Sequence, residues 1–454
     1  MSWSRQGYQW RRPLDCHDKL FRSIAAAGKP LGREHWLLVG AARVGFPPKI
    51  NKPEAIIRTA WSSLRFRHPD IALDLDGDEK IYEPVTNTES LEAWATATFH
   101  VENTVNSADE LFSRHLKIAG SSATCHYVAT NDEIAIVSSH WRWDGRGLVM
   151  MLHELLVELQ AAAAAEVQNH RLTRSFSQDE SHKLVPSLDV VMDVPMAPKV
   201  AWSARADELL APLQNGRSTI GLPVTGESLP RDTRRMGTVI SREKTEFLLE
   251  ACRSRGIRLT AALQASVIVE TARFQLQPDT GPVAQFKSWG AFDLRRYCPP
   301  PFDGPSHAPS LRMLGLPLVV DASVDWDALA LSMQTFYEKS FVPAESDLMF
   351  VRVPFVEKAT AMLAAATPTT EPSLSNLGVM DRYVQKKYGD GDDAISVHNI
   401  WLAVQMLSPQ LYVHTWSWDG ELHISICYNE AFYEEAFVAE WLRSLEKCLF
   451  TNLF

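Results

Sequence analysis

The chain has 454 residues, of which 46% are hydrophobic and 22% are charged, and its formal net charge at pH 7 is −10. A chain of this length can bury a large core, and two domains are the natural expectation. The negative net charge argues against nucleic acid as a partner, because domains that bind nucleic acid are usually basic.

The six cysteines are scattered and form no Cys-x-x-Cys pair. We therefore expect reduced thiols in the core or at the surface of a cytoplasmic protein, and neither a disulfide framework nor a zinc site. Residues 1–13 carry charges and lack the apolar stretch of a signal peptide. No apolar run reaches the length of a membrane span, so we expect no membrane partner.

The N-terminal part, residues 1–49, opens with a predicted irregular, aromatic arm (Trp3, Tyr8, Trp10) and continues with a mixed segment from Leu20 to Val44. Asn51 is the predicted N-cap of a helix that has Pro53 in its first turn, runs to about Phe66 and ends at His68-Pro69. Two further helices are predicted at residues 90–99 and 109–118.

A predicted strand–loop–helix junction follows. Strands at 123–130 and 133–139 are expected to form a hairpin around the Asn131-Asp132 turn. The loop after them reads His140-Trp141-Arg142-Trp143-Asp144-Gly145. Gly145 and Gly147 are expected in the turn, where backbone freedom is needed. A helix then begins, because apolar residues recur at helical spacing, namely Leu148, Met151, Leu152, Leu155, Leu156 and Leu159.

This junction places a histidine at the rim of a sheet. A neutral imidazole near pH 7 can take a proton from a hydroxyl or an amine, which makes His140 a candidate general base. Asp144 is expected to hold the loop, by pairing with an arginine rather than by touching the histidine. Trp141 and Trp143 are candidates for substrate binding in an apolar, dry site. The alternative is a structural histidine in a turn, but the agreement of strand, glycine and helix around this motif favours function.

His140, Asp144 and Gly145 resemble the His-x-x-x-Asp-Gly motif of the acyl-CoA-dependent acyltransferases. That superfamily includes chloramphenicol acetyltransferase, the plant BAHD enzymes, condensation domains and fungal trichothecene O-acetyltransferases. The sequence looks closest to the fungal trichothecene 15-O-acetyltransferase-like group. Ser139 stands where condensation domains usually have a second histidine, which favours a free-standing acyltransferase.

The resemblance implies an α/β fold of two chloramphenicol-acetyltransferase-like sandwich domains joined by a crossover loop, with an active-site tunnel at their interface. From about residue 170 to 241 the regular pattern fades and prolines recur, as expected of a long crossing loop that walls a ligand channel or serves as a solvated linker. We therefore predict an N-terminal domain at 1–205 that carries the motif, a crossover loop at 206–236 and a C-terminal domain at 237–454.

In the second half, strands and helices alternate, as expected of an α/β protein. Strands are predicted at 237–241 and 314–320, helices at 242–255, 260–274 (capped by Thr260), 326–339, 355–366 (starting after Pro354) and 431–449, and a hairpin around Asp419-Gly420.

Two stretches of the second half also resemble the superfamily. Asp293-Leu294-Arg295-Arg296 resembles an Asp-Leu-Arg-like strand end, which implies an arginine paired with Asp144. We favour Arg295 over Arg296, and the alternative is an exposed basic pair.

The second stretch, Ser373-Leu374-Ser375-Asn376-Leu377-Gly378, resembles a loop of the fungal and condensation branches, and the BAHD Asp-Phe-Gly-Trp-Gly motif is absent. Ser375 and Asn376 can donate hydrogen bonds to an oxyanion, and Gly378 allows close backbone approach. The alternative is an ordinary turn.

The predicted activity is O-acylation of a small apolar secondary metabolite, with acetyl-CoA as the acyl-CoA co-substrate, His140 as general base and no metal. Three alternatives stay open. The donor could be an acyl carrier protein, the scaffold could carry out a base-assisted cyclisation or isomerisation, or the chain could be a non-catalytic binding protein.

Overall fold

A computed structural model describes residues 2–168, 175–177, 179–195, 199–226, 229–275, 285–342 and 347–454. These residues form two compact units, each described here by itself. Unit 1 comprises Met1–Val194, Arg295–Arg312 and Asp381–Gln405, and unit 2 comprises Pro195–Leu294, Met313–Met380 and Met406–Phe454. Both units are discontinuous in sequence, whereas the prediction divided the chain into three consecutive segments.

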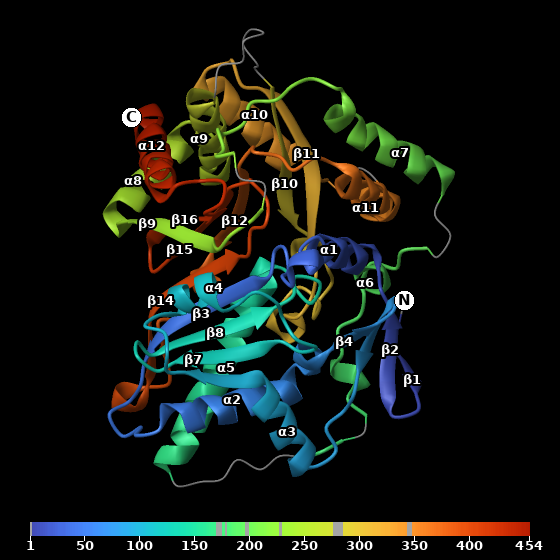
Figure 1. Ribbon diagram of the computed structural model, residues 1–454, viewed down its shortest axis with the longest axis vertical. Coiled ribbons are helices and arrows are strands. Elements are labelled where there is room, and N and C mark those ends of the chain that lie inside the picture. Colours follow the sequence, from blue (N-terminus) through green and yellow to red (C-terminus); the bar gives the residue numbers. More distant parts are fainter. Residues whose placement is uncertain are drawn as a thin grey trace. The chain divides into compact units, whose positions relative to one another are not determined.

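Unit 1 is built on a six-stranded sheet with the order β13-β14-β3-β8-β7-β6 (Figure 1). Its strands are β3 (Leu38–Gly45), β6 (Phe99–Glu102), β7 (Thr124–Val128), β8 (Glu133–Ser138), β13 (Lys387–Tyr388) and β14 (Ile395–Val404). The predicted hairpin is confirmed, since β7 and β8 pair in antiparallel register. All six residues of β8 are buried, which explains the continuous apolar run from Ile134 to Val137 in its middle.

Helices α2 (Pro53–Arg67) and α5 (Gly145–Val167) pack against each other and against this sheet. The predicted cap of α2 is wrong, because Lys52 occupies the N-cap position without a side-chain hydrogen bond. By length and composition alone, α5 is apolar enough to cross a membrane, which corrects the prediction that no segment is. However, 61% of its most apolar stretch is buried, and core helices pass the same test.

The aromatic N-terminal arm that was predicted to be irregular contains two strands instead. Strands β1 (Ser4–Gln6), β2 (Gln9–Pro13), β5 (Glu79–Tyr82) and β4 (Asp74–Asp76) form a second sheet in that order. Helix α1 (Cys16–Ala26) follows, with Asp15 as its N-cap. The other helices of unit 1 are α3 (Thr88–Thr98), α4 (Ala108–Arg114) and α6 (Leu188–Val191).

Unit 2 contains a four-stranded sheet and a separate hairpin. The sheet has the order β12 (Ser373–Val379), β15 (Tyr412–Trp418), β16 (Glu421–Asn429) and β9 (Thr233–Ile240), and the hairpin pairs β10 (Gln285–Asp293) with β11 (Met313–Asp321). The predicted hairpin around Asp419-Gly420 is confirmed as β15–β16. The helices are α7 (Val200–Leu210), α8 (Arg242–Ser254), α9 (Leu259–Phe274), α10 (Trp326–Lys339), α11 (Leu348–Ala365) and α12 (Glu435–Leu453).

Three of these helices correct the prediction. Helix α7 lies in the segment predicted to be irregular, and its buried face is a short stripe of Trp202, Ala206 and Leu210. Helix α11 contains Pro354 instead of starting after it, because the residues before the proline are apolar and buried, and their burial offsets the lost hydrogen bond. Helix α9 has Arg258 as its N-cap instead of Thr260.

All six cysteines are buried, and among the described residues none forms a disulfide bond.

Candidate active site

His140 lies two residues after the end of β8, with only 8% of its surface exposed. Its imidazole ring stacks on the ring of Phe21 from α1, with 4.0 Å between centroids and an interplanar angle of 10°. The indole of Trp36 lies at 6.1 Å with a tilt of 41°. Within the part of the chain that the structure describes, no other side chain hydrogen-bonds the His140 ring. The ring is thus held by aromatic contacts.

The environment of His140 keeps the ring neutral. Burial lowers its pKa to about 4, and a backbone hydrogen bond of His140 and the negative charge of Asp144 oppose this effect only in part. At pH 7 the imidazole is therefore in the basic form that a general base requires.

Trp36 has a φ of +60°, a left-handed conformation that is rare for a large side chain. Its backbone N–H donates to the carbonyl of Gln405 at 2.7 Å, which holds the residue in this conformation. Backbone strain of this kind gathers at functional sites, so its occurrence beside His140 agrees with a functional role for the histidine.

Asp144 holds the loop and does not bond to the histidine. It is the N-cap of α5, where its Oδ1 accepts from the N–H of Gly147 at 2.8 Å. Its Oδ2 accepts from Nη1 of Arg295 at 2.9 Å and from the N–H of Arg312 at 2.8 Å. Burial alone would raise the pKa of Asp144, but the charge and hydrogen bonds of Arg295 hold that pKa below its ordinary value.

Arg295 is the arginine that pairs with Asp144, of the two that the sequence offered. Both side chains are almost completely buried. The guanidinium also donates through Nη2 to the carbonyl of Ser310 at 3.1 Å, and the N–H of Asp144 donates to the same carbonyl at 3.3 Å. Arg296 is exposed and lies over the ring of Tyr297. One buried arginine thus fastens the His140 loop to the segment Arg295–Arg312.

Gly145 and Gly147 were expected in the turn before the helix. The structure places both of them inside the helix, at the start of α5. The reason for glycine at position 147 is close packing. A Cβ there would lie 2.6 Å from the carbonyl oxygen of Ala308 and 3.2 Å from Nη2 of Arg295. The glycine lets the helix start approach the segment that carries Arg295.

The residues between His140 and Asp144 are buried as well. Trp143 is fully buried and Trp141 is 6% exposed. Arg142, to which the sequence assigned no role, lies over the Trp141 ring and donates through Nη2 to the carbonyls of Leu73 at 2.7 Å and Ser121 at 3.1 Å. The loop is therefore pinned in its middle as well as at Asp144, and a substrate-binding role for the two tryptophans stays a prediction.

Ser375, Asn376 and Gly378 belong to unit 2, in strand β12. The predicted loop is wrong there, because the segment pairs in parallel with β15 through a bulge between Asn376 and Gly378. Gly378 has a φ of +76°, which favours glycine. Nδ2 of Asn376 donates to Oγ1 of Thr260 at 2.6 Å, and its Oδ1 accepts from the N–H of Gly378 at 2.9 Å. Their role as oxyanion donors stays a prediction.

Phe21 and Trp36 were missed by the sequence analysis. The start of α1 is marked in the sequence by Asp15 and Asp18, which form a capping box. That signal predicts a helix that carries Phe21, but no local pattern says that its ring meets a histidine 119 positions later. Among the described residues, no group of three or more His, Cys, Asp and Glu side chains could hold a metal ion.

The fold is similar to that of solved fungal acetyltransferase and condensation-domain structures. The solved structure of TRI3 trichothecene 15-O-acetyltransferase from Fusarium sporotrichioides is similar to this chain with a TM-score of 0.81 and 18% identity, over 99% of this chain and 96% of that one. At this identity the likeness establishes the fold. It confirms the two-domain α/β class that the motif implied.

Two fungal proteins are similar in sequence. Acetyltransferase pigO of Monascus ruber is 27% identical over 100% of this chain and 98% of its own length. O-acetyltransferase pigM of the same fungus is 28% identical over 93% of this chain and 81% of its own. No family model matches the chain. The chain is thus similar, over most of its length, to two fungal proteins that are acetyltransferases.

Proposed function

We propose that the chain transfers an acetyl group from acetyl-CoA to a hydroxyl group of an apolar secondary metabolite, with His140 as the general base. The observation that supports this best is the buried, neutral His140 ring, stacked on Phe21 and free of side-chain hydrogen bonds among the described residues. The acetyltransferase names of the two Monascus relatives favour an acetyl donor.

In the proposed reaction, Nε2 of His140 takes the proton of the acceptor hydroxyl, a step worth about 10²–10⁴ in rate. The acceptor oxygen attacks the thioester carbonyl carbon of acetyl-CoA and forms a tetrahedral oxyanion. The oxyanion collapses, the C–S bond breaks, and the imidazolium returns its proton to the departing thiolate. The products are an acetyl ester and free CoA, and His140 is neutral again.

Asp144 acts in this proposal as a positioning residue. Its charge is already balanced by Arg295, and both of its carboxylate oxygens accept hydrogen bonds from groups other than His140. It therefore fixes the loop that carries the base, and it takes no part in proton transfer.

The test is mass spectrometry of the purified protein incubated with acetyl-CoA and a pool of hydroxylated apolar metabolites. The expected result is a product heavier by one acetyl group, formed by the wild type and absent with His140→Ala. Circular dichroism and thermal unfolding would establish that the variant is folded.

Two other outcomes contradict the proposal. A metabolite that changes in a His140-dependent manner without acetyl-CoA would indicate a cyclase or isomerase. Acylation that occurs only with an acyl carrier protein as donor would move the chain to carrier-dependent chemistry.

A further inference from the structure

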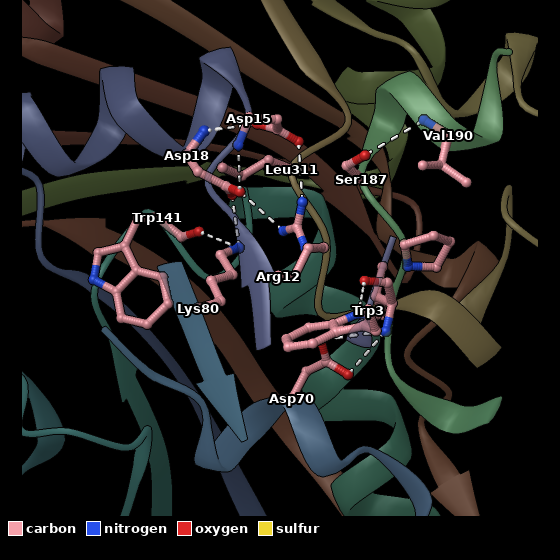
Figure 2. Close-up of polar contacts among 12 residues, drawn as sticks. Trp3, Arg12, Asp15, Asp18, Asp70, Lys80, Trp141, Ser187, Val190 and Leu311 are labelled. Atoms are coloured by element: carbon pink, nitrogen blue, oxygen red, sulfur yellow. Dashed lines mark hydrogen bonds and ion pairs between the residues drawn. The ribbon is translucent and has the colours of Figure 1, made fainter. Parts of the chain in front are cut away.

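Lys80, on β5, is a buried lysine that touches the His140 loop. Its side chain is 6% exposed. Its Nζ lies 2.6 Å from Oδ1 of Asp18 and donates to the backbone carbonyl of Trp141 at 3.1 Å, as Figure 2 shows. Nζ also lies 5.4 Å from the centre of the Trp141 ring. The ammonium thus joins the start of α1 to the residue that follows His140.

Asp18 receives this lysine and at the same time fixes the start of α1. Its Oδ2 accepts from the N–H of Asp15 at 3.2 Å, as one half of the capping box, and from Nη2 of Arg12 at 2.9 Å. Phe21, whose ring stacks on His140, comes three residues later on the same helix. Asp18 therefore supports His140 by two routes, through the Phe21 ring and through Lys80.

A buried cluster of this kind needs an explanation beyond stability. The desolvation of buried ion pairs is costly, and apolar residues of the same size often replace such pairs without loss of stability. The hydrogen bond from Lys80 to the carbonyl of Trp141 leaves the cluster and ends on the loop that carries the proposed base. The buried ammonium of Lys80 is therefore better explained by the backbone position that it fixes at Trp141.

We infer that Asp18 and Lys80 are positioning residues for His140: the buried pair fixes both the backbone at Trp141 and the Phe21 ring, and so sets the orientation of the imidazole. This inference rests on the proposed function. Neither residue touches the ring or is assigned to the reacting atoms, so their loss should lower kcat and leave KM almost unchanged.

The first test is Lys80→Met, which keeps the length of the side chain and removes the ammonium. We expect kcat for acetyl transfer to fall about 10- to 100-fold, the scale of a misplacement of roughly 1 Å, with KM within about threefold of the wild type. The matched control is Arg11→Met on strand β2, which removes a partly exposed cation from Asp76 and Glu79 without touching the cluster. The control should retain wild-type kcat.

The second test does not depend on acyl transfer. Diethyl pyrocarbonate modifies neutral imidazoles, and peptide mass spectrometry gives the modification rate of His140 itself. In the wild type, stacking and burial should make this rate slow at pH 7, and in Lys80→Met it should rise at least about fivefold because the loop loosens. If the wild type proved to have no acetyltransferase activity, these rates would still decide whether Lys80 positions the ring.

A double variant separates geometry from charge balance. Lys80→Met leaves the buried cluster of Arg12, Asp15, Asp18 and Lys80 with one cation fewer, although Arg12 still pairs with Asp18. Asp18→Asn in that background restores the charge balance of the cluster. We expect the double variant to regain most of the lost thermal stability and none of the lost kcat. The inference is overturned if a folded Lys80→Met, or the double variant, shows wild-type kcat and a wild-type labelling rate.

Discussion

In the proposed mechanism, acetyl transfer depends on a histidine that is kept neutral. His140 is buried against Phe21 and Trp36, and its pKa is lowered to about 4. A lowered pKa means that the basic form persists to lower pH than for a histidine in water. The same burial makes the transient imidazolium costly, so its proton should pass on quickly, as the return to the thiolate requires.

This environment predicts the pH profile of acetyl transfer. Because His140 takes up a proton only near pH 4, kcat/KM should be flat between about pH 5.5 and 8 and should fall only below about pH 5. The measurement is kcat/KM against pH in buffers of constant ionic strength, within the range where thermal unfolding shows the protein to be folded. A half-maximal point near 6.5, the value of a solvated histidine, would contradict this account.

Arg295 and Arg296 provide a matched pair of substitutions. Arg295→Met leaves the Asp144 carboxylate buried without its cation, so we expect a loss of about 3–5 kcal/mol in the free energy of unfolding. Arg296→Met removes an exposed charge one position later and should change the free energy by less than about 0.5 kcal/mol. Urea denaturation gives both values. Equal losses for the two variants would show that the Asp144 pair does not hold the loop.

At the scale of elements, the start of α5 decides where the loop lies. Asp144 caps the helix, and Gly147 lets its first turn approach the carbonyl of Ala308. Asp144 thus connects the motif, the start of α5 and the segment that carries Arg295. This contact has a tolerance of only a few tenths of an ångström, because the facing atom is backbone and cannot rotate away.

Gly147→Ala tests this contact. Alanine favours a helix interior over glycine by about 1 kcal/mol, so helix propensity alone predicts a more stable protein. We expect a less stable protein instead, with a loss of about 1–3 kcal/mol and reduced kcat, because the new Cβ overlaps the Ala308 carbonyl. Gly120→Ala is the control, since a Cβ there meets nothing within 4 Å. A stabilised, fully active Gly147→Ala would refute the packing argument.

Elements with strong local patterns could be predicted from the sequence. The β7–β8 hairpin is marked by its turn residues and α10 by apolar residues at helical spacing. Both predictions are confirmed. The segment of Ser375 and Asn376 could not be predicted, because its polar residues resemble a turn and only pairing with β15 makes it a strand. Helix α11 was shortened in the prediction, since tertiary burial before Pro354 overrides the usual effect of proline.

At the scale of the whole molecule, unit 1 is assembled from distant segments. Strand β14 pairs with β3, so that Val404 lies opposite Leu38, and Arg295 reaches Asp144 across 151 positions. Local periodicity carries no information about such pairings. The family resemblance supplied the two-domain class, and the motif supplied His140 and Asp144, but Phe21, Trp36, Arg142 and Lys80 act through long-range contacts that no short pattern encodes.

The discontinuity makes a prediction about truncation. A fragment of residues 1–205 lacks β14 and Arg295, so β3 would become an open edge and Asp144 would lose its partner. We expect this fragment to unfold without a cooperative transition or to aggregate, whereas the full chain unfolds cooperatively. Differential scanning calorimetry of both proteins is the measurement, and a cooperative transition of the fragment near the temperature of the full chain would be evidence against the assignment of residues 381–405 to unit 1.

The central claim is that His140 is the base of an acyl transfer. The most direct measurement is the rate of acetyl transfer by wild type and His140→Ala, on the acceptor identified by mass spectrometry, with CoA release and product formation followed together. The account predicts that the variant, folded as judged by thermal unfolding, loses about 10²–10⁴ in kcat and that CoA and ester appear in equal amounts in the wild type. A folded His140→Ala with wild-type kcat would contradict it.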